Sequence, residues 1–137
     1  MILDSSSIVA ILRAEPEAPN FTKKIESAAG SPAGCRVSAV SYVETAVVID
    51  SARDAIASRR FDDFFRTGKI KVEAVTPRQA ELARQAYRDF GKGRHKAGLN
   101  LGDCFAYALA KEKDEPLLFK GDDFCHTDIE PAEDAST

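Results

Sequence analysis

The chain has 137 residues, a length that fits one domain with a buried hydrophobic core. Its composition, 44% hydrophobic and 30% charged, is ordinary for a soluble globular protein, and no apolar run approaches the ~20 residues that a membrane span requires. The net charge of −3 argues against a simple nucleic-acid-binding module. It argues less against an enzyme that acts on nucleic acid, because local basic patches can offset the acids of a metal site.

Two further features of the composition concern location and redox state. The first residues lack the basic region and long apolar segment of a signal peptide, since Asp4 interrupts the apolar start. We therefore expect a cytoplasmic protein with no membrane contact. Cys35, Cys104 and Cys125 are odd in number and form no CxxC pair, so we expect reduced thiols rather than a disulfide framework or a zinc site.

Apolar patterning in the first half predicts strands that alternate with helices. The predicted elements are a buried strand over 1–3, a helix over 5–13, a helix over 21–29, a short strand over 35–38, a helix over 39–52 and a helix over 54–68. The helix over 39–52 is apolar nearly all round, which favours a central position. On the next helix Phe61, Phe64 and Phe65 share one side, and this aromatic face is either core or a docking surface.

The second half continues the alternation. Its predicted elements are a strand over 70–75, a helix over 76–90, a basic glycine-rich loop over 91–98, a helix over 101–113, a buried strand over 116–119 and a turn over 121–124. Thr76, Pro77 and Gln79 form a helix start with a capping box. On the helix over 101–113 the residues expected to face the core are Leu101, Cys104, Phe105, Ala108 and Leu109. The polar tail over 130–137 is expected to be frayed.

This alternation predicts an α/β fold for a single domain over 1–137, with a mostly parallel central sheet and helices on both faces. We find no internal repeat and no low-complexity segment. In such a sheet, ligands bind at the edge where the strands end and the helices begin.

Acidic residues occur at several of these strand-to-helix edges. They are Asp4, Glu44, Asp103 and the pair Asp122 and Asp123. Each has a plain structural alternative. Asp4 can cap the first helix, Glu44 can close a capping box that starts at Ser41, and Asp103 can favour the first turn of a helix after Asn100. Asp122 and Asp123 can be ordinary turn residues.

The acids taken together favour a metal site. All lie in apolar surroundings, and no basic residue occurs within two positions of Asp4, Glu44 or Asp103. Charges in such surroundings are costly unless they are paired or bind a metal. A hard divalent cation prefers oxygen ligands, and oxygen-only ligation selects Mg²⁺ or Mn²⁺ over zinc.

Four motifs in order resemble the PIN-domain ribonucleases and, more narrowly, the VapC toxins of bacterial VapBC toxin–antitoxin pairs. They are Ile-Leu-Asp-Ser-Ser over 2–6, Ser-Tyr-Val-Glu-Thr-Ala over 41–46, the segment over 87–104 with its Leu-Asn-Leu-Gly-Asp-Cys end, and Leu-Leu-Phe-Lys-Gly-Asp-Asp-Phe over 117–124. The resemblance covers essentially the whole chain. It implies a PIN-like three-layer α/β/α fold.

The resemblance also implies roles for individual residues. Asp4 and Asp103 match direct metal ligands, and Glu44 matches the acid that binds a second ion or orients the attacking water. The fourth acid is Asp122 or Asp123, and the position directly before the phenylalanine favours Asp123. Two neighbours match supporting residues: Ser6 supports the first aspartate, and Asn100 caps the helix of Asp103.

For function, the resemblance implies a Mg²⁺-dependent toxin endoribonuclease, with Mn²⁺ as a substitute, that leaves a 5′-phosphate and a 3′-hydroxyl on RNA. Its partners would be a cognate antitoxin and a second copy in a homodimer, with DNA contacted only through the antitoxin. Lys92, Arg94 and Lys96 are candidate contacts for substrate phosphates, and the alternative is a solvated loop. For His95 a phosphate contact or an exposed position is preferred over a general base.

Two other functions remain as alternatives. The chain could be a non-catalytic subunit of a complex in which an antitoxin represses DNA, although the intact acids argue against it. A haloacid-dehalogenase-like phosphatase also opens with an aspartate after a strand. That chemistry requires a second aspartate two residues later, where this chain has Ser6.

Overall fold

A parallel sheet forms the centre of the computed structural model, which describes residues 1–132. Within these residues the sheet has the strand order β3-β2-β1-β4. The strands are β1 (Ile2–Leu3), β2 (Arg36–Ser38), β3 (Lys71–Glu73) and β4 (Leu117–Leu118). All three pairings are parallel, so the carboxyl ends of the strands lie at the same edge. The predicted α/β fold with a parallel sheet is confirmed.

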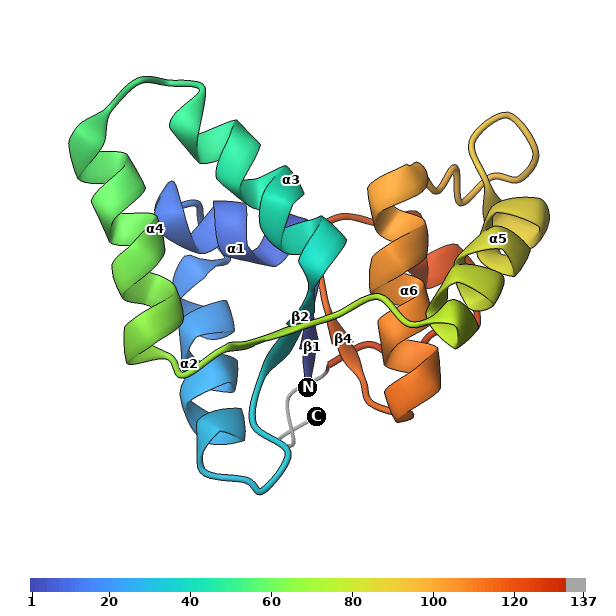
Figure 1. The fold of residues 1–137 in the computed structure, drawn as a ribbon, viewed down its shortest axis with the longest axis horizontal. Helices are drawn as coiled ribbons and strands as arrows, with labels where there is room; N and C mark the ends of the chain where they lie inside the picture. The colour runs from blue at the N-terminus through green and yellow to red at the C-terminus, as the bar shows by residue number, and fades with distance from the viewer. Residues whose placement is uncertain (133–137) are drawn as a thin grey trace.

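Helices cover both faces of this sheet (Figure 1). They are α1 (Ser5–Leu12), α2 (Ala18–Ala29), α3 (Ala39–Asp50), α4 (Ala55–Thr67), α5 (Pro77–Phe90) and α6 (Leu101–Lys113), followed by the short 3-10 helix η1 (Asp123–His126). In the view of Figure 1, α5 and α6 lie on one side of the strands, and α1, α2 and α4 lie on the other.

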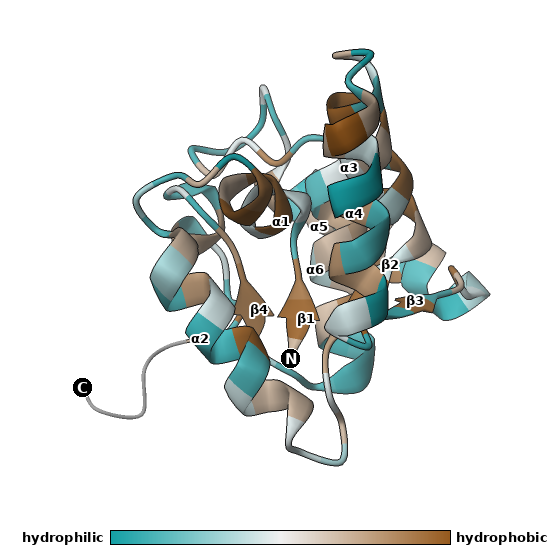
Figure 2. Cartoon of the chain, turned by 90° about the vertical axis from the view of Figure 1, so that its left-hand side faces the viewer, coloured by the Kyte–Doolittle hydropathy of each residue, from teal (hydrophilic) through white to brown (hydrophobic). Residues whose placement is uncertain are grey.

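The core has two parts because neighbouring residues of a strand face opposite sides of the sheet. Ile2 and Leu117 belong to the cluster beneath α5 and α6, whereas Leu3 and Leu118 belong to the cluster beneath α1 and α2. Figure 2 shows β1 and β4 as apolar strands at the centre of the molecule. Because β1 and β4 are buried on both faces, neither of these two-residue strands carries a polar residue.

Two predictions of burial are wrong. Helix α3 is not central, because the side chains of Val43 and Val47 are 57% and 61% exposed. Its buried face carries Ser41, Thr45 and Ile49. Leu101, expected to face the core, is 74% exposed in the first turn of α6. The apolar composition of these two helices therefore overstated how many of their side chains are buried within the single chain.

Helix starts differ from expectation in two places. Helix α2 begins at Ala18 rather than Phe21, with Pro19 in its first turn, where a helix leaves backbone N–H groups unpaired and tolerates proline. The predicted capping box of α5 is only half formed. Thr76 Oγ1 accepts from the backbone N–H of Gln79 at 3.1 Å, but the Gln79 side chain donates to Glu112 on α6.

The aromatic side of α4 packs inward. The rings of Phe61 and Phe65 lie 4.9 Å apart, and both contact the ring of Tyr42 on α3. Phe61 is buried, and Phe64 and Phe65 pack against the α1–α2 part of the core. These rings are therefore core, the first of the two alternatives.

The segment after η1 is more ordered than a frayed tail. Leu117 donates to Glu130 O and accepts from Ala132 N, each at 2.9 Å, so residues 130–132 pair alongside β4. The prediction of fraying is wrong for these residues, and the rest of the tail, 133–137, lies outside the described residues. A polar composition did not reveal this pairing because it uses only backbone groups.

The cysteines and the hydropathy agree with the composition. Cys35 and Cys104 are buried free thiols, and Cys125 is an exposed one. Among residues 1–132, no helix is long and apolar enough to cross a membrane.

Candidate active site

Three acidic side chains come together at the carboxyl edge of the sheet. Asp4 directly follows β1, Glu44 lies in the second turn of α3, and Asp103 lies in the first turn of α6. The backbone N–H of Asp4 donates to Leu118 O at 2.9 Å, which fixes the end of β1 beside the end of β4. Helix α3 packs against both α1 and α6, so the three acids approach from adjoining elements.

The two carboxylate oxygens of Asp4 have different surroundings. Oδ2 accepts from the backbone N–H of Ser6 at 3.0 Å and from Ser6 Oγ at 2.5 Å, which caps α1. Ser6 Oγ in turn accepts from the backbone N–H of Lys120 at 3.0 Å. Oδ1 is buried and has no hydrogen-bond partner among residues 1–132, and Asp4 as a whole is only 2% exposed. Asp4 is therefore a helix cap that also leaves a buried oxygen for another group.

Glu44 does not close a capping box with Ser41. Helix α3 begins one turn earlier than that box requires, with Ser38 as its N-cap. Glu44 Oε1 instead accepts from Ser5 Oγ at 2.7 Å, which joins α3 to the start of α1. The Glu44 carboxylate also lies directly against Gly102, in the space that a side chain at position 102 would occupy.

Asp103 belongs to a complete capping box. Asn100 Oδ1 accepts from the backbone N–H of Asp103 at 2.9 Å, and Asp103 Oδ2 accepts from the backbone N–H of Asn100 at 3.0 Å. Asn100 thus holds Asp103 as expected. The box uses one carboxylate oxygen of Asp103, Oδ2.

Burial and the neighbouring negative charges both favour the protonated forms of Asp4 and Asp103. Burial raises the pKa of Asp4 above its usual 3.8, and the negative charge of Glu44 raises it further against the hydrogen bonds from Ser6. Burial likewise raises the pKa of Asp103 from 3.8 to about 7, with added repulsion from Asp4, Glu44 and Asp123. Carboxylates that lack a counter-charge in partly buried surroundings are a frequent mark of functional sites.

The two candidates for the fourth acid follow β4. Both residues are exposed after β4, and Asp123 begins η1. Asp123 is among the charges that raise the pKa of Asp103, whereas Asp122 is not.

The donor chemistry of these residues fits a hard divalent cation. Among residues 1–132, no group of three or more histidine, cysteine, aspartate or glutamate side chains is arranged so that it could hold a metal ion as it stands. The donor set nevertheless consists of carboxylate oxygens, and Asp4 Oδ1 is a buried oxygen without a partner. Both features suit a cation such as Mg²⁺.

The basic loop stands apart from the acids. Lys92, Arg94 and Lys96 are exposed, and the Arg94 guanidinium lies over the Tyr87 ring at 5.3 Å. His95 is half-buried, and its Nδ1 accepts from the backbone N–H of Ala97 at 3.0 Å. Over residues 1–132, no hydrogen bond or ion pair joins these four side chains to Asp4, Glu44 or Asp103.

Three residues of the site were missed as individual contributors: Ser5, Gly102 and Lys120. Ser5 and Lys120 act through contacts between distant segments, for which the sequence carries no local signal. Gly102 had a signal, because a glycine within a helix is unfavourable for the helix itself.

Comparison with known sequences agrees with this geometry. The PIN domain family matches residues 1–130. Ribonuclease VapC28 of Mycobacterium tuberculosis is 49% identical over 135 residues, which cover 98% of each chain. Ribonuclease VapC of Mycolicibacterium smegmatis is 46% identical over 129 residues, which cover 94% of this chain and 97% of that one.

Solved structures share the fold at low sequence identity. A toxin–antitoxin complex from Klebsiella pneumoniae superposes with a TM-score of 0.68 at 16% identity, covering 93% of this chain and 92% of that one. VapC20 of Mycobacterium tuberculosis, a toxin that cleaves the sarcin–ricin loop, superposes with a TM-score of 0.64 at 20% identity, covering 95% and 98%. These likenesses show the fold alone.

Proposed function

This chain belongs to the PIN-domain family and to its VapC branch, and on that premise we propose that it is a toxin endoribonuclease that depends on Mg²⁺ and is restrained by a cognate antitoxin. The observation that carries the proposal is the convergence of Asp4, Glu44 and Asp103 at the carboxyl edge of the sheet, with a buried oxygen of Asp4 left unpaired. Family membership removes the phosphatase alternative.

Asp4 Oδ1 and a carboxylate oxygen of Asp103 would hold Mg²⁺ or Mn²⁺. Glu44 would bind a second ion or orient the attacking water, and Asp123, rather than Asp122, would complete the outer ligands. Bound there, the metal supplies a water of lowered pKa and a positive charge for the scissile phosphate. Ser6 keeps Asp4 Oδ2 engaged, so that Oδ1 is the oxygen directed to the site.

The substrate would meet the chain on its basic side. Residues 84–96 carry five lysines and arginines against one aspartate, in a chain whose net charge is −3. The exposed side chains of Lys92, Arg94 and Lys96 can contact RNA phosphates without reading sequence. His95 would add a contact from its Nε2 rather than act as the general base.

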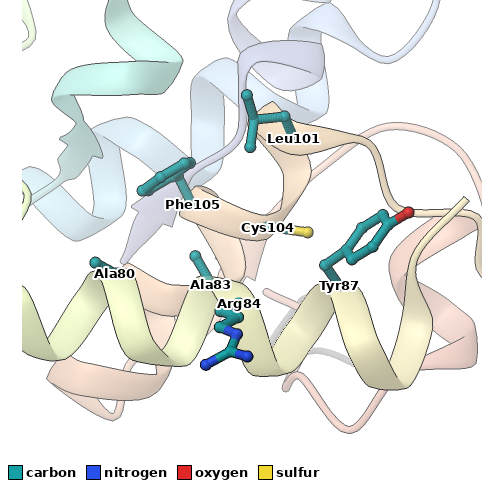
Figure 3. Close-up of a pocket in the computed structure, with 7 residues that line it drawn as sticks. All are labelled: Ala80, Ala83, Arg84, Tyr87, Leu101, Cys104 and Phe105. Atoms are coloured by element: carbon teal, nitrogen blue, oxygen red, sulfur yellow. The ribbon is translucent and has the colours of Figure 1, made fainter.

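Exposed apolar side chains support protein partners. Val43 and Val47 on α3 and Leu101 on α6 face solvent in the single chain. An apolar groove of about 420 Å³ lies between α5 and α6 (Figure 3), and it is lined by Ala80, Ala83, Arg84, Tyr87, Leu101, Cys104 and Phe105. A homodimer and a complex with the antitoxin would bury these surfaces. Contact with DNA would then occur through the antitoxin.

The direct test uses the purified chain, freed of antitoxin and incubated with structured RNA. Cleavage is expected with Mg²⁺, not in excess EDTA, and not with Asp4→Asn. Asp62→Asn, on the exposed surface of α4, is the matched control and should cleave as the wild type does. Equal cleavage in EDTA, or by Asp4→Asn, would exclude a metal-dependent nuclease. A chain that forms the antitoxin complex on DNA but cleaves no cellular RNA would favour the non-catalytic alternative.

A further inference from the structure

Gly102 leaves a space that the Glu44 carboxylate fills. Gly102 is a buried residue in the first turn of α6. A Cβ atom at this position would lie 2.1 Å from Glu44 Oε2, 2.6 Å from Cδ and 2.7 Å from Oε1. Atoms cannot approach so closely without a clash, so the observed place of the carboxylate requires glycine here.

The same carboxylate also accepts a hydrogen bond from Ser5. Ser5 Oγ donates to Glu44 Oε1 at 2.7 Å, and Ser5 directly follows Asp4 at the start of α1. Glu44 thus contacts the starts of both α1 and α6. Asp4 caps the first of these helices, and Asp103 lies in the first turn of the second. The position of Glu44 relative to the other acids depends on both contacts.

Local propensity does not explain a glycine at position 102. Within a helix, glycine is the least favourable residue apart from proline, and alanine is the most favourable. The backbone of Gly102 is helical and does not need the left-handed conformation that glycine permits, since its φ is not positive. The missing side chain, rather than backbone freedom, is the useful property.

We infer that Gly102 is a positioning residue, whose absent Cβ sets where the Glu44 carboxylate stands relative to Asp4 and Asp103. A side chain at 102 would displace the Glu44 carboxylate from its place against α6 and disturb its hydrogen bond with Ser5 Oγ. The steric contact between position 102 and Glu44 is independent of the proposed function, whereas its effect on metal binding rests on that function.

A four-member cycle tests the inference: wild type, Gly102→Ala, Glu44→Ala and the double variant. Bound metal is removed from all four proteins with EDTA. The midpoint of thermal unfolding of each is then measured, and its affinity for Mn²⁺ is measured by calorimetry. In the wild-type background, Gly102→Ala should lower the midpoint and weaken Mn²⁺ binding about 10-fold or more, the usual cost of losing a residue that orients a ligand. In the Glu44→Ala background it should leave the midpoint equal or higher, because only helix propensity remains.

Two controls separate the causes. In the first control, Gly102→Ala is added to Glu44→Gln, which keeps the size of the side chain at position 44 but removes its charge. The fall in the thermal midpoint caused by Gly102→Ala should persist in this background. Gly30→Ala, where a Cβ would meet its nearest neighbour at 3.6 Å and φ is −80°, should leave Mn²⁺ affinity unchanged.

Equal effects of Gly102→Ala with and without Glu44, or unchanged Mn²⁺ affinity in a wild-type background that binds Mn²⁺, would overturn the inference. If the wild type binds no Mn²⁺, the proposed function fails, while the thermal cycle in EDTA still decides the steric relation. If Gly102→Ala fails to fold but the double variant folds, the inference stands. If neither folds, the inference is wrong, because alanine is then harmful without Glu44.

Discussion

At the scale of single residues, Asp4 carries two tasks on one carboxylate. Oδ2 serves the fold by capping α1 through Ser6, and Oδ1 remains buried without a partner. A buried polar atom without a hydrogen bond is costly, so natural proteins keep few of them. The cost at Asp4 is consistent with a site that is completed by a cation.

Ser6→Ala tests how much the hydroxyl contributes to this arrangement. The variant loses the bond from Ser6 Oγ to Asp4 and leaves the backbone N–H of Lys120 without its acceptor. We expect a loss of about 1–3 kcal/mol in the free energy of unfolding, measured by urea titration. Ser58→Ala, which removes an exposed bond to Asp50, should cost less than about 1 kcal/mol. Equal losses in the two variants would contradict the special place of Ser6.

The raised pKa of Asp103 predicts a pH dependence of stability. Because burial raises this pKa from 3.8 to about 7, the folded chain between these values holds a proton that the unfolded chain has released. The contribution of Asp103 to stability is therefore fully present below the lower value and is lost as pH rises through the upper one. In EDTA, the free energy of unfolding of the wild type should fall relative to Asp103→Asn across this window.

Urea titrations of both proteins at a series of pH values measure that difference. The asparagine side chain of the Asp103→Asn variant keeps an oxygen that can accept from the backbone N–H of Asn100, so the capping box is retained in the comparison. A difference that stays constant from acid to neutral pH would show that Asp103 is not desolvated in the folded chain.

At the scale of elements, the helix starts place the chemistry. Asp4 precedes α1 and Asp103 lies in the first turn of α6, so the caps that begin these helices also orient the acids. Helix α5 begins with a comparable cap at Thr76, which has no acid of the site beside it. Helices α5 and α6 therefore offer a matched pair for separating stability from activity.

Asn100→Ala and Thr76→Ala should each lower the free energy of unfolding by about 1 kcal/mol, because each removes an N-cap. Only Asn100→Ala should also lower Mg²⁺-dependent RNA cleavage, since it frees Asp103 from its box. Denaturant titration and a cleavage assay on the same preparations provide both measurements. A parallel fall of activity in the two variants would assign the effect to stability alone.

At the scale of the whole molecule, the parallel sheet gathers the carboxyl ends of its strands at one edge, and some apolar side chains of the surrounding helices stay uncovered. Leu101 is 74% exposed beside the α5–α6 groove, and Val43 and Val47 are exposed on α3. Apolar side chains grouped on a surface mark contact sites more often than chance exposure.

We therefore expect the isolated chain to elute as a dimer in size-exclusion chromatography with light scattering. Leu101→Lys should shift it toward monomer, because a charge would be buried at the contact, while leaving the thermal midpoint of the monomer unchanged. Ile56→Lys, at an exposed position on α4, is the control and should not change the mass. A monomeric wild type would refute the dimer.

Much of the molecule was readable from short-range patterns. The alternation of strands and helices, the caps at Thr76 and Asn100, and the acids at strand-to-helix edges each depend on residues within a few positions of one another. The assignment of those acids to a metal stays a prediction. The errors arose where one segment meets another: α3 was expected in the centre, and Gln79 was expected to cap its own helix rather than bond Glu112.

The sequence by itself determined the order of the elements and the identity of the candidate acids, because hydrophobic period and capping are local properties. Only the tertiary structure decided that Glu44 bonds Ser5 and lies against Gly102, since these contacts join segments that are far apart in the chain. It also decided which oxygen of Asp4 is left free. Those outcomes depend on how the parallel sheet brings α1, α3 and α6 together at one edge.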